Sequence, residues 1–209
     1  MKARARGTVL GARSAPRKQR QPGTGSAGYQ GQSPWLVSVD GVSGSAVTQA
    51  AQRLASAGRG GRAGISRWDA SGIFGDLEAA EQEVDKPSAR TLLLLYAADL
   101  AFRLRWEIRP ALAEGRWVIA APYVDTAIAL GRAAGIDEAW LRNMFEFAPV
   151  PAERRYVERA SAATAPGQGL IEFACLRLAG METRSARRDL VTRTRARLKL
   201  KATRRRARS

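Results

Sequence analysis

Residues 35–45 read Trp-Leu-Val-Ser-Val-Asp-Gly-Val-Ser-Gly-Ser, and this stretch decides the fold. Its first half is a short apolar run typical of a buried parallel strand. Its second half is a turn rich in glycine and serine, and a helical pattern follows from Val47 and ends at Gly58. A strand, a glycine-rich turn and a helix in this order form the unit in which backbone N–H groups and a helix N-terminus can hold a phosphate.

The rest of the chain repeats the alternation of strand and helix. We expect strands at residues 65–68, 117–121 and 170–176. We expect helices from Ser88 as N-cap to a stop at Gly115, over 123–130, from Asp137 as N-cap to about residue 147, and in the Arg-rich C-terminal segment. This alternation predicts an α/β fold with a parallel sheet.

The composition excludes several classes of protein. The chain has 209 residues, 45% of them apolar and 26% charged, which suits one domain with a real core. It has no histidine, so Ser-His-Asp or Cys-His catalysis and histidine-ligated metals are excluded. The single cysteine, Cys175, forms no internal disulfide, and we expect a cytoplasmic protein. No apolar run approaches the roughly 20 residues of a membrane-spanning helix, so we expect no membrane association.

The positive charge gathers at the two ends of the chain. Residues 1–34 carry seven Lys or Arg and no acid, and residues 184–209 carry twelve and one acid, Asp189. Since the whole chain is +16, residues 35–183 have a net charge of −2. We expect a disordered basic arm at 1–34, a folded domain at 35–200 and a disordered basic tail at 201–209.

The basic ends have more than one interpretation. The N-terminal arm lacks the apolar stretch of a secretory signal, but an Arg-rich start without acids is also typical of an organelle transit peptide. Both ends are either solvated charge or a site that binds nucleic acid or another polyanion through its phosphates. Residues 184–209 contain no aromatic side chain, so base stacking is not expected there.

The order of the motifs resembles the thymidylate kinase family of P-loop enzymes, which phosphorylate dTMP with ATP and Mg²⁺. The resemblance covers residues 35–149 and rests on Leu92–Asp99, Ile108–Leu112, Gly115–Ile119, Tyr123–Asp125, Asp137–Arg142 and Phe147–Pro149. It implies a three-layer P-loop kinase-like fold around a central parallel sheet. It also implies a homodimer formed through the long helix, with Phe102 and Trp106 at the interface.

The resemblance implies a phosphate loop that departs from the family pattern G-x-x-x-x-G-K-[ST]. Ala46 takes the place of the second glycine, and Val47 takes the place of the lysine that draws the phosphates together. Four positions remain as candidates for holding ATP: Gly41, Gly44, Ser45 and Thr48, whose hydroxyl is also the candidate ligand for Mg²⁺.

Other family motifs are degenerate too. Ala121-Pro122-Tyr123 replaces Asp-Arg-Tyr, which removes two charged groups, and Asp99-Leu100 replaces an acid–arginine pair. The resemblance implies that Arg67, Tyr96 and Tyr123 bind substrate. Each has a plainer alternative: Arg67 is a surface residue, and both tyrosines are packing rings.

Three further expectations concern an ion pair, a helix cap and the segment after Pro149. Asp99 pairs with Arg103, and Asp125 caps the helix that follows it. The family's next strand and its arginine-bearing lid are not recognisable after Pro149, unless Leu170–Leu178 with Arg184, Arg187 and Arg188 is their displaced remnant.

We therefore expect a thymidylate kinase homologue that is catalytically impaired, and that binds nucleotide weakly or acts through a partner. One alternative is an active dTMP kinase in which Arg67, Thr48 and a lid arginine do the chemistry. A second alternative is a protein without enzymatic activity that binds polyanions through its basic ends.

Overall fold

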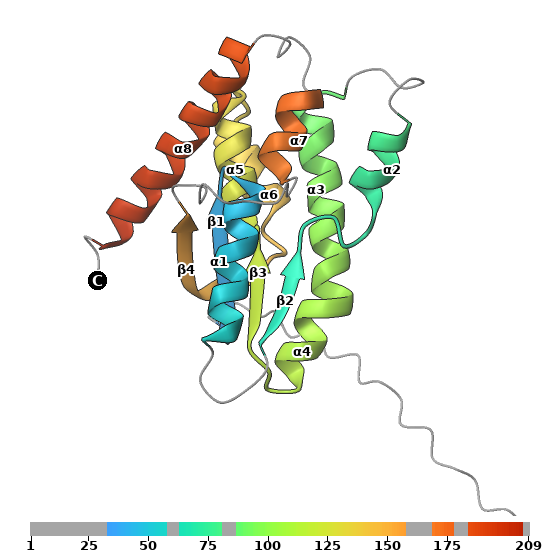
Figure 1. Cartoon of the computed structure of the whole chain (residues 1–209), viewed down its shortest axis with the longest axis vertical. Coiled ribbons are helices and arrows are strands. Elements are labelled where there is room, and N and C mark those ends of the chain that lie inside the picture. Colours follow the sequence, from blue (N-terminus) through green and yellow to red (C-terminus); the bar gives the residue numbers. More distant parts are fainter. Residues whose placement is uncertain (1–32, 58–62, 81–86, 158–168, 178–183, 207–209) are drawn as a thin grey trace, which may run out of the picture.

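A four-stranded parallel sheet forms the centre of the molecule (Figure 1). The computed structural model describes residues 33–57, 63–80, 87–157, 169–177 and 184–206. The strands lie in the order β2-β3-β1-β4. Their bounds are β1 (Ser33–Gly41), β2 (Gly64–Arg67), β3 (Val118–Ala121) and β4 (Pro151–Val157). The predicted α/β fold with a parallel sheet is therefore confirmed.

Eight α-helices of the described residues connect or cover these strands. Their bounds are α1 (Gly44–Ser56), α2 (Ile73–Ala79), α3 (Ala89–Arg103), α4 (Arg109–Ala113), α5 (Val124–Ala133), α6 (Glu138–Met144), α7 (Leu170–Arg177) and α8 (Arg184–Arg206). A π-helical turn, Leu104–Ile108, joins α3 to α4, directly before Pro110, which has no N–H to continue an α-helical ladder.

Two apolar clusters hold the sheet between helices. Because side chains alternate along a strand, Leu36 of β1 joins one cluster and its neighbour Val37 joins the other. The smaller cluster, which includes Val39 and Ile119, lies under α1, the helix in front of β1 and β3 in Figure 1. The larger cluster draws on α3 and α5 to α8.

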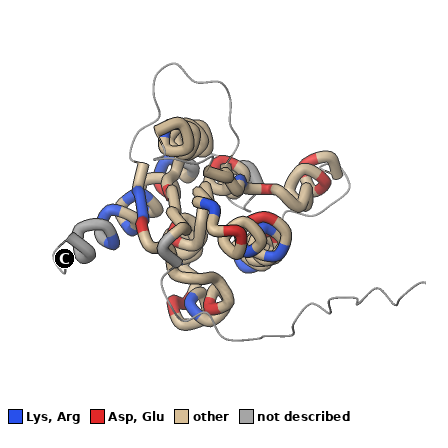
Figure 2. Tube along the Cα trace, turned by 90° about the horizontal axis from the view of Figure 1, so that it is seen from below, with Lys and Arg blue, Asp and Glu red and all other residues tan. Residues whose placement is uncertain are grey.

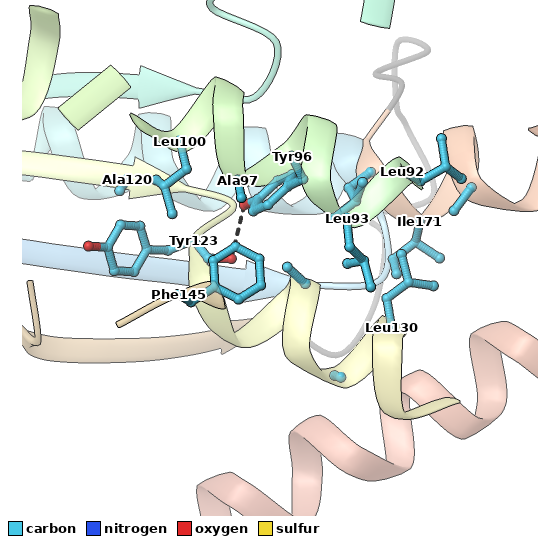
Figure 3. Packing of buried hydrophobic residues seen from close by; sticks show 14 of the residues in the cluster. Leu92, Leu93, Tyr96, Ala97, Leu100, Ala120, Tyr123, Leu130, Phe145 and Ile171 are labelled. Atoms are coloured by element: carbon cyan, nitrogen blue, oxygen red, sulfur yellow. Dashed lines mark hydrogen bonds between the residues drawn. The ribbon is translucent and has the colours of Figure 1, made fainter. Parts of the chain in front are cut away.

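The larger cluster contains several of the residues of the long helix that the sequence marked as apolar. Leu92 and Leu93 of α3 lie near Leu130 of α5 and Ile171 of α7, whereas Leu100 lies near Ala120 of β3 (Figure 3). All six are at most 2% exposed. Leu92 and Leu93 of the leucine run are thus core residues, whereas Leu94 is exposed.

Most predicted elements are confirmed, including both predicted N-caps. Ser88 Oγ accepts from Thr91 N at 3.1 Å, and Asp137 Oδ1 accepts from Trp140 N at 2.9 Å. The strand predicted at 170–176 is wrong, because this segment is helix α7. A short apolar run does not distinguish a buried strand from a buried helix, and here the N–H of Phe173 bonds to Gly169 O in a helical turn.

The strand after Pro149 was missed. It is β4, which pairs with β1 from Ser33↔Pro151 to Gly41↔Val157. Its alternate residues are exposed charged side chains, Glu153 and Arg155, so it lacks the apolar run that marks a buried strand.

The expected basic ends fall largely outside the described residues. Residues 1–32 are not described, while residues 33–34 belong to β1 rather than to the expected arm. Helix α8 continues to Arg206, so residues 201–206 of the expected disordered tail are helical. Between β2 and α3 the structure describes residues up to 80, which include α2, and again from residue 87. No helix in the described ranges is both long enough and apolar enough to span a bilayer.

Candidate functional site

The turn between β1 and α1 is where the sequence predicts phosphate binding. Only Val42 and Ser43 separate the end of the strand from the start of the helix. Ser43 is the N-cap: its Oγ accepts from Ala46 N at 3.4 Å, and its carbonyl accepts from Val47 N at 2.9 Å. The N–H groups of Ala46 and Val47 are therefore used inside the first helical turn.

Val47, which the resemblance aligns with the family's lysine, belongs to the core. Its side chain is 2% exposed and packs in the apolar cluster with Val37, Val39 and Ile119. Ala46 is 4% exposed. The side chains that follow the turn therefore serve to attach α1 to the sheet.

A carboxylate of the chain itself lies at the N-terminus of α1. Glu172 Oε1 of α7 accepts from Gly44 N at 2.8 Å. Gly169, just before α7, packs so tightly here that a Cβ on it would lie 2.7 Å from Gly44 Cα. Burial raises the pKa of the Glu172 carboxyl. Glu172 thus occupies the place at which a helix N-terminus favours an anion.

The remaining candidate ATP positions are gathered here, and several have partners within the chain. Gly41 N donates to Thr126 Oγ1 at 3.2 Å, and Ser45 Oγ lies 3.0 Å from Ser43 Oγ. Thr48 is half-buried in the first turns of α1. Across the described residues, no group of three His, Cys, Asp or Glu side chains is placed to hold a metal ion.

The two candidate tyrosines are packing rings. Tyr96 is fully buried, donates its hydroxyl to Tyr123 O at 3.0 Å, and meets Phe145 edge to face (Figure 3). Tyr123 is 2% exposed and donates its hydroxyl to Pro149 O at 2.9 Å. Neither ring presents a face to a ligand, so the plainer alternative for both is the one the geometry favours.

A buried arginine occupies the space beside Ala121-Pro122. Arg103 is fully buried; its Nε donates to Ser66 Oγ at 2.9 Å, and its Nη2 donates to Ser66 O at 3.0 Å and Pro122 O at 2.9 Å. Its Nη1 lies 3.8 Å from Asp99, so the expected i,i+4 pair is present. Sequence spacing indicated that pair but not the link from α3 to β2 and β3.

Carboxylates of the chain also accept the hydrogen bonds of the turn after β2. Asp99 accepts from Ser71 N and Ser71 Oγ, both at 2.9 Å, and burial raises its pKa. Asp69 accepts from Phe74 N at 2.8 Å and from Gly75 N at 3.0 Å. Arg67, the candidate for monophosphate binding, precedes this turn and its side chain is exposed.

Two buried aspartates lie between the carboxyl ends of β1 and β4. Asp40 Oδ1 accepts from Tyr123 N, Thr126 N and Thr126 Oγ1 at 2.8–3.0 Å. Burial, with the nearby Asp125 charge, raises the pKa of Asp40 to about 6. Its Oδ2 is buried and has no hydrogen-bond partner among the described residues.

Asp125 is the hub of an ionic cluster, and the prediction that it caps α5 is wrong. Both of its oxygens accept from Arg154 Nη1 at 3.0 Å, Oδ2 accepts from Tyr156 at 2.6 Å, and Lys201 of α8 also binds it. Burial opposes its ionisation, but Lys201 and Arg154 outweigh this and lower its pKa. These partners were missed, because β4 was not recognised and residue 201 is far away in sequence.

The raised pKa of Asp40 predicts a pH-dependent stability. When the pKa of a carboxyl is higher in the folded chain than in the unfolded chain, the free energy of unfolding falls as the pH rises from the lower pKa to the higher one. Asp40→Asn cannot ionise, so its free energy of unfolding relative to the native chain should rise by about 3 kcal/mol between about pH 4 and pH 7 and then level off. Urea denaturation over that pH range measures this. The exposed Asp76→Asn is the control, and a pH-independent difference for Asp40→Asn would contradict the assignment.

The contact of Glu172 with α1 predicts a loss of stability on truncation. Glu172→Ala removes the acceptor of Gly44 N and should lower the free energy of unfolding by about 1 kcal/mol, because the first N–H of α1 loses its hydrogen-bond partner. Glu172→Gln keeps an acceptor oxygen and should cost less. Urea denaturation beside the exposed control Glu146→Ala measures both. Equal stability of Glu172→Ala and the control would show that the contact contributes nothing.

Three curated proteins share short stretches of sequence with this chain. A thymidylate kinase of Syntrophus aciditrophicus is 43% identical over 56 residues, 26% of either chain. A probable thymidylate kinase of Pyrococcus horikoshii is 39% identical over 75 residues, 36% of this chain and 37% of that one. A thymidylate kinase of Trichormus variabilis is 50% identical over 46 residues, 22% of either chain. The chain thus spans between 22% and 37% of the length of these relatives.

The fold extends the similarity over most of the chain. A crystal structure of thymidylate kinase from Ehrlichia chaffeensis superposes with a TM-score of 0.58 at 14% identity, over 82% of this chain and 87% of that one. No family model matches the chain. The chain is thus similar to thymidylate kinases in local sequence, and it has the thymidylate kinase P-loop fold.

Proposed function

We propose that this chain is a thymidylate kinase-like scaffold that does not transfer phosphate from ATP to dTMP at the rates of a working kinase. The observation that carries the proposal is the position of Val47, an apolar core residue where the family has its phosphate-binding lysine. Phosphoryl transfer depends on positioned charge that offsets the charge of the transition state. Valine offers neither a charge nor a hydrogen-bond donor.

The other groups around the turn support the same proposal. Glu172 at the N-terminus of α1 would repel the phosphates of ATP, and Ala46 N and Val47 N already donate within the turn. At the end of β3, Ala121 and Pro122 bring no charge that could help to hold Mg²⁺ or phosphate. We infer that these residues do not fit ATP with Mg²⁺, although Thr48 retains a hydroxyl.

A scaffold acts through partners, and one proposed partner is a second copy of the chain. Three large apolar side chains of α3 and the π-helical turn that follows it are exposed. The exposed fractions are 54% for Leu94, 40% for Phe102 and 62% for Trp106. Spacings of eight and four residues place them along one helix face. Exposed apolar faces of this kind mark interfaces, so we propose a homodimer through this helix.

A second candidate function is binding of nucleic acid or another polyanion. The observation that favours it is α8, which carries eleven Lys or Arg and one acid, Asp189. We place either function in the cytoplasm, because the single cysteine suits a reducing compartment.

Turnover tests the first proposal. The purified chain, with ATP, Mg²⁺ and dTMP, should transfer phosphate at least about a thousandfold more slowly than the roughly 1–100 s⁻¹ of ordinary kinases. A matched variant restores Ala46→Gly, Val47→Lys, Ala121→Asp and Pro122→Arg together. Turnover of the native chain in the ordinary range would overturn the proposal and favour the alternative of an active kinase that uses Arg67 and Thr48.

Sedimentation tests the homodimer. Phe102→Glu with Trp106→Glu places two charges on the exposed helix face and should turn a dimer into a monomer, without unfolding it, since both positions are exposed. The control is Glu114→Lys, which changes the charge of an exposed residue at the end of α4, outside the apolar face. A native chain that sediments as a monomer, or a double variant that stays dimeric, would count against this interface.

A further inference from the structure

Helix α8 has one face turned into the protein. Leu190 and Thr194 are fully buried, Leu198 is 5% exposed, and both leucines belong to the larger apolar cluster. These residues lie four apart, so they form a single stripe along the helix. The stripe fixes which side of α8 faces solvent.

The outward side of α8 is basic. Exposed side chains on it include Arg193, Arg195 and Arg197, and the helix shows repeated blue bands in Figure 2. Its only acid, Asp189, lies 3.2 Å from Arg193, which leaves a large excess of positive charge. Near its C-terminal end, Lys201 binds the buried Asp125 and ties the helix to the ionic cluster.

The basic side chains on the outward side of α8 form two rows, and small side chains lie between the rows. At 100° per residue, Thr192 and Ala196 lie opposite the buried stripe, and both are exposed. Arg188, Arg195 and Lys199, all exposed, follow one flank of this pair, and Arg193 with Arg197 follows the other. Two rows of cations about one helix diameter apart, with small side chains between them, match the two phosphate backbones that border a groove of a duplex.

We propose that the outward face of α8 binds double-stranded nucleic acid by lying along a groove, with its two basic rows on the two phosphate backbones. Arginine suits this task because its guanidinium can donate two hydrogen bonds to one phosphate. The site recognises charge and groove shape and does not read the base sequence. This face does not include the turn between β1 and α1. A failure of the proposal on catalysis would therefore not affect the proposal on binding.

Two other anionic partners fit the helix less well. A membrane-bound helix inserts an apolar face into the lipid, but the apolar stripe of α8 is buried against the protein. Single-stranded nucleic acid is gripped by aromatic stacking, and residues 184–206 contain no aromatic side chain. The duplex is therefore the partner that the surface favours.

Anisotropy of a labelled duplex tests the proposal. The full chain is titrated against a mixed-sequence duplex of about two helical turns, at several salt concentrations between roughly 50 and 200 mM. Arg195→Gln with Arg197→Gln removes one charge from each row. It should weaken binding about tenfold and make the slope of log affinity against log salt shallower by about two, because each phosphate contact contributes about 0.9.

The matched control removes the same charge elsewhere. Arg53→Gln with Arg142→Gln alters exposed arginines of α1 and α6 and should leave affinity and slope close to native. Equal losses in the two double variants would overturn the proposal, because net charge alone would then explain binding. So would tighter binding to a single strand of the same sequence, or binding to phosphatidylserine vesicles with none to the duplex.

Discussion

The hydrogen bond from Gly44 N to Glu172, together with the burial of Val47 beside it, closes the N-terminus of α1. A helix that starts two residues after a strand presents free N–H groups and a partial positive charge, and these groups need an anion or an acceptor. Here Ser43 accepts from Ala46 N and Val47 N, and Glu172 accepts from Gly44 N, so three of these N–H groups have acceptors within the chain. Because Glu172 belongs to α7, the same contact holds α7 over α1 and joins the helices beyond the sheet to the sheet itself.

Carboxylates also accept backbone hydrogen bonds elsewhere at the C-terminal ends of the strands. Asp69 and Asp99 accept from the turn after β2, and Asp40 accepts from the N-terminus of α5. In a P-loop kinase fold this edge is where ligands bind, since strand ends and helix N-termini converge there. Carboxylates that accept these hydrogen bonds use up the donors of the turns, and they make the same edge less receptive to phosphates.

The sequence predicts the sheet and the helices that cover it because their signals are local. Apolar runs mark β1 and β3, and Ser88 and Asp137 cap their helices as expected. The failures depend on tertiary context. β4 was missed because charged side chains alternate along it, and α7 was assigned to a strand because its apolar run has no clear period. The substitution at Val47 is visible in the sequence, but the role of Glu172 needs the contact between α7 and α1, 128 residues apart.

Groups of the chain itself occupy the turn between β1 and α1, where a P-loop kinase would hold phosphate. A titration of the ¹⁵N-labelled chain with ATP and Mg²⁺, read by NMR at the amides of Gly44, Ser45 and Val47, tests it most directly, because it separates this turn from any attraction of ATP to α8. The account predicts no saturable shift of these amides at millimolar ATP. Saturable shifts there at micromolar ATP would contradict it.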